Sequence, residues 1–189
     1  MKAYFTASIS GKNEYGKSYS GIVEELRRNG YDVQDHILKT DPSQINDQTD
    51  KERVTYYKKM VDMISKCDVC VAEISTSSLS VGHEITIALE KGKPVIAFYD
   101  KRISPNLIKG IDSDKFQAVS YDSQNLEDAV KTAVSKARST MDIRFNFFIS
   151  PQINEYLDWI SRIKRIPRAV YLRELLEKEM AKNKEYKKG

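Results

Sequence analysis

The sequence predicts a doubly wound α/β domain with a parallel sheet, followed by a small strand–helix–helix module. In the first 137 residues, short apolar runs typical of strands alternate with stretches that repeat apolar residues at helical spacing. Because consecutive parallel strands need helical crossovers, this alternation indicates one five-stranded parallel sheet. Beyond residue 142 the pattern changes to one strand-like run and two helical stretches, which indicates a separate unit.

The expected elements follow from these patterns in chain order. Gly30 ends the first helix and Gly92 ends the third, since glycine is favoured just past a helix C-terminus. A polar stretch rich in Asp, Asn, Gln and Ser is long enough to be a lid or a substrate loop, at residues 38–49. We expect strands at 2–7, 31–36, 69–72, 93–99 and 116–120, and helices at 19–29, 51–66, 80–91 and 125–137.

A polar turn at Ser77–Glu84 connects the strand at 69–72 to the helix that follows. In a parallel sheet this turn lies at the carboxyl edge of the strands, where such sheets bind ligands. Glu84 falls in the first turn of the helix, beside a glycine and several hydroxyl groups. Chemistry at a glycosidic bond needs a carboxylate in such a polar pocket, although the helix dipole alone also favours a glutamate there.

Length and composition limit the classes of protein that fit. With 189 residues, 40% hydrophobic and 31% charged, the chain can bury one core and a small appendage. No apolar run reaches membrane-spanning length and no signal-peptide pattern is present, so we expect a cytoplasmic protein without a membrane partner. Cys67 and Cys70 are expected on opposite faces of a strand, with a structural role, and we predict no metal and no cofactor.

Positive charge is concentrated in the last quarter of the chain. Residues 142–189 hold eleven Lys and Arg against seven Asp and Glu, an excess of +4 that equals the net charge of the whole chain. Residues 1–141 are therefore electrically balanced. The asymmetry indicates a module with an anionic partner, or else a solvated basic end.

Four ordered segments resemble one enzyme family. They are Tyr4–Gly11 (Tyr-Phe-Thr-Ala-Ser-Ile-Ser-Gly), Asp68–Ile74, Ser78–Glu84 (Ser-Leu-Ser-Val-Gly-His-Glu) and Gly92–Val95. Over about residues 1–137 the chain is similar to the nucleoside 2-deoxyribosyltransferase superfamily, and most similar to its 2'-deoxynucleoside 5'-monophosphate N-hydrolase branch. The resemblance implies a flavodoxin-like sheet, cleavage of an N-glycosidic bond, and a homodimer whose active site the two subunits can share.

The resemblance also assigns roles to residues. It implies that Glu84 attacks the anomeric carbon as a nucleophile, and that two serine loops contact the phosphate. Relatives direct a polar residue of the loop at Ser104–Asn106 into the partner's active site, and any polar residue of this loop could serve. The expected substrate-binding residues are Ser8, Ser10, Gly11, Ser78, Gly82, His36 and Asn106. His36 is included because it ends the second strand and could reach the pocket, and a capping histidine with satisfied hydrogen bonds fits this position equally well.

Three positions depart from the family pattern. Met60 stands where the family has an Asp that contacts the sugar and assists proton transfer. Ser10 replaces the arginine of the phosphate loop, and Ser80 replaces a glycine of the second serine loop. The first change bears on turnover and the second on preference for a monophosphate, whereas nucleotide binding could survive both.

The last part of the chain has a signature of its own. Apolar and other residues alternate from Ile143 to Ile149, as in a half-buried strand, and Ser150 and Pro151 then open a helix. A break at Ile166–Pro167 begins a second helix. About forty residues cannot form a core alone, but two copies could by pairing their strands.

Residues 143–182 resemble a ribbon-helix-helix module. The resemblance implies that Arg144, Asn146 and Phe148 enter the DNA major groove and that Arg168 meets phosphate. Arg and Asn suit base edges, whereas Phe suits thymine methyl groups or a protein surface. The alternative is a module that only dimerises.

We divide the chain into an α/β domain at residues 1–138, a linker at 139–142, a dimerisation or DNA-binding module at 143–184 and a basic tail at 185–189. Two functions compete for it. The first is a homodimeric nucleotide N-glycosidase, acting by hydrolysis or transfer on a nucleoside 5'-monophosphate or nucleoside. The second is a nucleotide sensor with little or no turnover that controls DNA binding. The Glu84 and serine motifs favour the enzyme, and a NAD-cleaving domain fits them less well.

Overall fold

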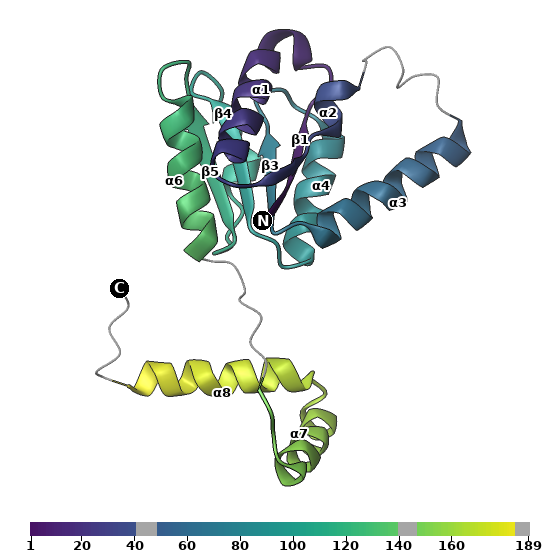
Figure 1. Ribbon diagram of the computed structural model, residues 1–189, viewed down its shortest axis with the longest axis vertical. Coiled ribbons are helices and arrows are strands. Elements are labelled where there is room, and N and C mark those ends of the chain that lie inside the picture. The colour runs from purple at the N-terminus through teal and green to yellow at the C-terminus, as the bar shows by residue number, and fades with distance from the viewer. Residues whose placement is uncertain (41–48, 140–146, 184–189) are drawn as a thin grey trace. The chain divides into compact units, whose positions relative to one another are not determined.

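The computed structural model describes residues 1–40, 49–139 and 147–183 (Figure 1). The chain divides into two compact units, Met1–Asp142 and Ile143–Gly189. Within the described ranges, every helix is too short or too polar to cross a membrane.

The first unit is built on a five-stranded sheet in which all neighbouring strands are parallel. The second strand lies on one side of the first strand, and the third, fourth and fifth strands lie on the other side. The strand order therefore reverses between the first and third strands, and such a reversal opens a crevice at the carboxyl ends of the strands. The predicted α/β fold with a flavodoxin-like parallel sheet is confirmed. The strands are β1 (Lys2–Ala7), β2 (Asp32–Gln34), β3 (Val69–Glu73), β4 (Val95–Asp100) and β5 (Phe116–Tyr121), in the order β2-β1-β3-β4-β5.

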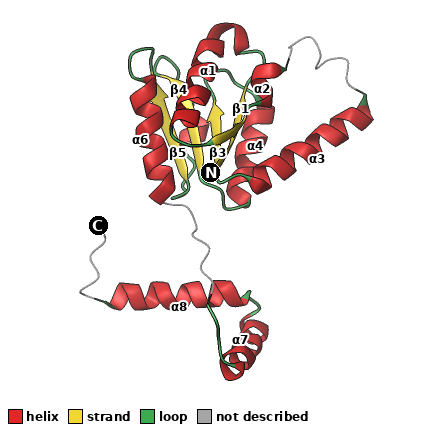
Figure 2. Ribbon diagram, in the orientation of Figure 1, coloured by secondary structure: helices red, strands yellow, loops and turns green. Residues whose placement is uncertain are grey.

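Helices cover both faces of this sheet (Figure 2). Successive residues of a strand face opposite sides, so Phe5 of β1 joins the core beneath the first and last helices of the unit. Tyr4 joins the opposite core, which the middle helices cover. The helices are α1 (Lys12–Arg28), α2 (His36–Lys39), α3 (Asp50–Lys66), α4 (Leu79–Glu90), α5 (Asn106–Lys109) and α6 (Leu126–Ser139).

Several boundaries differ from the sequence prediction. Helix α1 begins at Lys12 and not at Tyr19, because the Tyr15 N–H already donates to the Gly11 carbonyl at 2.8 Å. Its polar first turns carry little of the apolar stripe on which the prediction depended. The second strand ends at Gln34, and His36 begins α2 instead of ending a strand. Of the predicted polar loop, residues 38–39 belong to α2 and residues 41–48 lie outside the described part of the chain.

The two cysteines correct another prediction. Cys67 and Cys70 are both buried and free, and they belong to the same core and not to opposite faces. Cys67 is the C-cap of α3 and precedes β3, so the alternation of a strand does not apply to it.

The second unit contains α7 (Pro151–Lys164) and α8 (Arg168–Lys182). Ser150 is the N-cap of α7 and accepts a hydrogen bond from the Ile153 N–H at 3.4 Å, as the sequence predicted. The buried hydrophobic core of the second unit consists of Leu157, Ile160 and Tyr171. Residues 147–150 form neither helix nor strand in the single chain, and the rest of the predicted strand, 143–146, lies outside the described residues.

Candidate functional site

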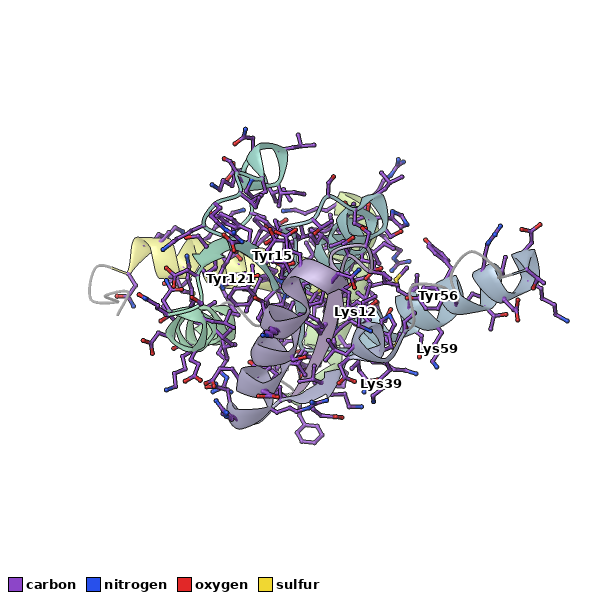
Figure 3. All side chains as sticks on the ribbon, turned by 90° about the horizontal axis from the view of Figure 1, so that it is seen from above. Lys12, Tyr15, Lys39, Tyr56, Lys59 and Tyr121 are labelled. Atoms are coloured by element: carbon purple, nitrogen blue, oxygen red, sulfur yellow. The ribbon has the colours of Figure 1, made fainter. Side chains whose placement is uncertain are left out.

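The candidate site lies at the carboxyl edge of the sheet, between the segments that leave β1 and β3. One segment is Ser8–Gly11, which enters α1, and the other is Ser75–Ser78, which enters α4. Figure 3 looks onto this edge from above and labels Lys12 on α1 and Tyr56 on α3. Parallel strands therefore bring together loops that are separated by more than sixty positions in the sequence.

Glu84 lies in the second turn of α4, and not in the first turn as predicted, and it is buried, with 7% of the residue exposed. The Tyr4 hydroxyl, from β1, donates a hydrogen bond to Glu84 Oε2 at 2.9 Å. Burial raises the pKa of Glu84 above its ordinary value, and hydrogen bonds from Thr6 and Tyr4 partly offset this rise. A carboxylate held in this way is poorly hydrated and oriented, which suits attack on an electrophilic carbon.

A row of aromatic rings extends from this carboxyl group. Tyr4 stacks on His36, with ring centroids 5.7 Å apart, and His36 Nε2 lies 2.8 Å from the Tyr56 hydroxyl oxygen. Burial and then the charge of Lys59 lower the pKa of His36, so its ring is neutral at pH 7. Burial and then the charge of Glu84 raise the pKa of Tyr56 to about 12.

Hydrogen bonds fix the first serine loop, Ser8–Gly11. Ser8 Oγ and Ser10 Oγ lie 2.9 Å apart, and the Tyr19 hydroxyl donates to the Ser8 carbonyl at 3.1 Å. Gly11 fits so closely that a Cβ atom there would lie 2.3 Å from Thr76 Oγ1. The two loops are thus in contact, and their hydroxyl groups could share one anionic group.

The second serine loop also borders a cavity. Ser78 is the N-cap of α4 and accepts a hydrogen bond from the Val81 N–H at 3.4 Å. A cavity of about 1000 Å³ between α4 and α5 is lined by Ser78, Gly82 and Asn106, with several isoleucines. Glu84 and His36 are absent from its lining. Of the predicted residues, Ser78, Gly82 and Asn106 therefore line this cavity, and Thr76 beside them is in contact with Gly11 of the first loop.

A buried carboxyl group at the end of β3 was missed by sequence reasoning. Glu73 is fully buried and accepts hydrogen bonds from the Ser75 hydroxyl and, at 2.8 Å, from the Tyr121 hydroxyl. Burial raises the pKa of Glu73. The sequence signal that could have identified Glu73 is an acidic residue at the end of an apolar strand. Its contact with Tyr121 of β5 could be seen only in the folded structure.

The sequence also gave no indication of a contact between α3 and α4. Tyr57 stacks on His83, with ring centroids 5.9 Å apart, and the Tyr57 hydroxyl lies 3.3 Å from His83 Nε2. Met60, at the position of the family's Asp, is buried in the core beneath these helices and offers no titratable group. Within the described ranges, His, Cys, Asp and Glu side chains form no group of three or more that could hold a metal ion.

The predicted DNA-contacting residues belong to the second unit. Phe148 is fully exposed. Arg168 donates to Asn154 Oδ1 at 2.8 Å and forms an ion pair with Asp158, so its guanidinium is already engaged within the module. Arg144 and Asn146 lie outside the described residues.

The sequence profile of the nucleoside 2-deoxyribosyltransferase family matches residues 3–129. The chain belongs to this family. The prediction of the family, and of an enzyme of the N-glycosidase and deoxyribosyltransferase kind, is confirmed.

The chain is similar to several individual proteins. The 5-hydroxymethyl-dUMP N-hydrolase of Rattus norvegicus is 29% identical over 122 residues, which cover 62% of this chain and 75% of the relative. The enzyme of the same name from Mus musculus is 29% identical over 128 residues, covering 66% and 74%. The structure of a CMP N-glycosidase from Clostridium botulinum has a TM-score of 0.49 and 18% identity, and the match covers 70% of this chain and 98% of that one.

Proposed function

We propose that this protein cleaves the N-glycosidic bond of a nucleoside 5'-monophosphate or nucleoside, with Glu84 as the nucleophile. The observation that carries the proposal is the buried Glu84 carboxyl, held by the Tyr4 hydroxyl at the edge where the sheet binds ligands. The names of the relatives, which are nucleotide N-hydrolases, support the same reaction.

The proposed reaction proceeds through a covalent sugar. The Glu84 carboxylate attacks the anomeric carbon, the carbon–nitrogen bond breaks, and its electron pair leaves with the base. Water in hydrolysis, or an acceptor nucleobase in transfer, then displaces Glu84 from the sugar. The Tyr4 hydrogen bond fixes the orientation of the carboxyl group, and the cost of burying it makes its conversion to a neutral ester favourable.

The serine loops are the proposed site for a 5'-phosphate. Ser8, Ser10 and Gly11 lie before α1, and Ser78 lies before α4, so hydroxyl groups and backbone N–H groups at two helix N-termini can bind the anion. Lys12, at the start of α1, donates to the carbonyl groups of Leu38 (2.7 Å) and Thr40 (2.9 Å), so its ammonium group is held at the C-terminal end of α2.

Product analysis tests the proposal. The protein is incubated with a panel of ribonucleoside and 2'-deoxynucleoside 5'-monophosphates, and free base is measured by chromatography. We expect base release from the wild-type protein and from Glu90→Ala, which changes an acid at the end of the same helix, and none from Glu84→Ala. Base release by Glu84→Ala at the wild-type rate would contradict the role of Glu84.

A nucleotide sensor is the second candidate, and the buried Met60 is the observation that favours it, since no proton donor is present at that position. In this case nucleotides would raise the melting temperature of the protein without any release of base.

The second unit is proposed to hold two copies of the chain together, either on DNA or alone. Its small core leaves Trp159 and Leu176 more than half exposed, as expected of a module completed by a second copy. The loop at Ser104–Asn106 could then reach the partner's site. Binding of labelled duplex DNA by the full chain, measured against salt concentration, distinguishes the two cases.

A further inference from the structure

Departure of a nucleobase requires more than a nucleophile. When the carbon–nitrogen bond breaks, the electron pair remains on the base, and a nearby proton donor stabilises the departing base. Ionised Glu84 has no proton to donate. The Tyr4 hydroxyl is already engaged with Glu84 Oε2 at 2.9 Å. A second donor on the same side of α4 is therefore needed.

The pair formed by His36 and Tyr56 lies on this side. The His36 ring stacks on Tyr4, and His36 Nε2 is 2.8 Å from the Tyr56 hydroxyl oxygen. The two rings meet edge to face, with centroids 5.8 Å apart. Glu84, Tyr4, His36 and Tyr56 thus form a continuous series of contacts from α4 through β1 and α2 to α3.

The surroundings of His36 decide which partner donates. His36 Nδ1 is buried and has no hydrogen-bond partner within the described structure. A buried N–H without an acceptor is rarer in proteins than an unpaired acceptor, so we assign the ring proton of neutral His36 to Nε2. Nε2–H then donates to the Tyr56 oxygen, and the proton of Tyr56 is directed away from His36. Tyr56 is 40% exposed, so this proton is accessible to a substrate.

We propose that Tyr56 is the acid that protonates the departing base and that His36 is the residue that positions it; this inference rests on the proposed function. In the first step Glu84 bonds to the sugar, and the base leaves with the electron pair and the Tyr56 proton. In the second step water bonds to the sugar, its proton returns to the Tyr56 phenolate, and Glu84 leaves as a carboxylate. Nucleotide and water give base and sugar phosphate, and both residues return to their starting states.

The Tyr56 hydroxyl is protonated at neutral pH, and conversion of Glu84 to a neutral ester removes the charge that, after burial, raises the pKa of Tyr56 to about 12. Tyr57 and His83 form a similar pair 3.3 Å apart, but His83 lines the cavity between α4 and α5, from which Glu84 is absent. Tyr57 is 47% exposed, close to the exposure of Tyr56. Tyr57→Phe is therefore a matched control.

The test compares two leaving groups. Base release is measured for a nucleotide that the wild-type protein cleaves and for its fluorinated counterpart, 5-fluoro for a pyrimidine or 2-fluoro for a purine, whose base leaves more readily as an anion. We expect Tyr56→Phe to lower kcat on the parent nucleotide about 100-fold and on the fluorinated one much less. Tyr57→Phe should lower kcat on both nucleotides by less than about threefold, which is far below the loss expected when a general acid is removed.

The role of His36 is tested by rescue. His36→Gln retains an N–H group that can donate to Tyr56 and should keep most of the activity, whereas His36→Phe should repeat the leaving-group dependence of Tyr56→Phe. Equal losses on both nucleotides in Tyr56→Phe would overturn this inference and leave the proposed function intact. If the wild-type protein releases no base from any nucleotide, the proposed function fails, and this inference fails with it.

Discussion

The proposed role of Glu84 connects stability to activity at a single residue. It is nearly excluded from water, and the Tyr4 hydrogen bond offsets only part of the cost of its charge, so its pKa is raised. A group with a raised pKa in the folded state stabilises the fold below its unfolded pKa, and this contribution is lost as pH rises through the folded pKa. At neutral pH the ionised carboxylate therefore destabilises the protein.

Replacement of Glu84 by Gln removes this charge and keeps the shape. We expect Glu84→Gln to raise the melting temperature at pH 7, with a smaller effect at pH 4, where the wild-type carboxyl is protonated. Base release should fall at least about 1000-fold, because the nucleophile is lost. Thermal unfolding at both pH values, with the exposed Glu24→Gln as control, checks the sign. A lower melting temperature at pH 7 would contradict the destabilising role of the ionised carboxyl.

Removal of the Tyr4 hydroxyl should change the pH dependence of the reaction. The hydrogen bond from Tyr4 lowers the pKa of Glu84, so in Tyr4→Phe this pKa rises further. Since attack needs the carboxylate, we expect the acid limb of the kcat/KM profile to move to higher pH. Tyr31→Phe, which removes a hydroxyl that accepts from Arg138, should leave the limb in place. An unchanged limb in Tyr4→Phe would show that another group sets it.

At the scale of elements, the site depends on close contact between the loop after β1 and the loop after β3. Gly11 is the N-cap of α1, and its Cα lies against Thr76 and the Tyr19 hydroxyl. The Tyr19 side chain reaches from the same helix back to the Ser8 carbonyl, so α1 supports the loop from which it begins. The serine hydroxyls are thus positioned by packing.

A methyl group at Gly11 should disrupt this contact. A Cβ would lie 2.3 Å from Thr76 Oγ1 and 2.5 Å from the Tyr19 hydroxyl oxygen, so we expect Gly11→Ala to reduce the free energy of unfolding by about 1–3 kcal/mol. Gly16 lies in the same helix, and a Cβ there would meet only Lys12 Cγ, at 3.7 Å.

Gly16→Ala should therefore raise the free energy of unfolding by about 0.5–1 kcal/mol, because alanine is the better helix former. Urea denaturation of both variants provides the measurement. The argument from packing would be wrong if the two substitutions had the same effect.

At the scale of the whole molecule, the two units differ in the size of their hydrophobic cores. The first unit has two large cores, one on each face of the sheet. The second buries only Leu157, Ile160 and Tyr171 and leaves apolar side chains of α7 and α8 exposed. This imbalance is the basis for expecting a second copy of the chain at the second unit.

Leu176, which is 65% exposed on α8, tests this expectation. Burial of a leucine is worth about 1.5–3 kcal/mol, so Leu176→Glu should weaken self-association of the full chain at least about tenfold. Ala181→Glu adds the same negative charge to the same helix at an exposed position and should have little effect. Sedimentation velocity over a range of concentrations provides the comparison, and equal dissociation constants for both variants would exclude this face as an interface.

Strands were predicted best where they are apolar along most of their length. The strands at β1 and β3 and the start of α4 agree with the prediction to within about one residue, because local sequence decides them. Helix α1 and β2 were less accurate, since the first turns of α1 are polar and β2 has only three residues. His36 was misplaced for this reason, at the end of a strand and not in a helix.

The order of apolar runs and the four motifs were enough to determine the α/β fold and the family and to predict Glu84 as a site residue, since periodicity and motif spacing are properties of the chain alone. Only the tertiary structure decided the contacts between distant segments: Tyr4 with Glu84, His36 with Tyr56, and Glu73 with Tyr121. The physical reason is that these side chains meet across strands and helices separated by twenty to eighty residues. Their distances, burial and pKa values exist only after the sheet has formed.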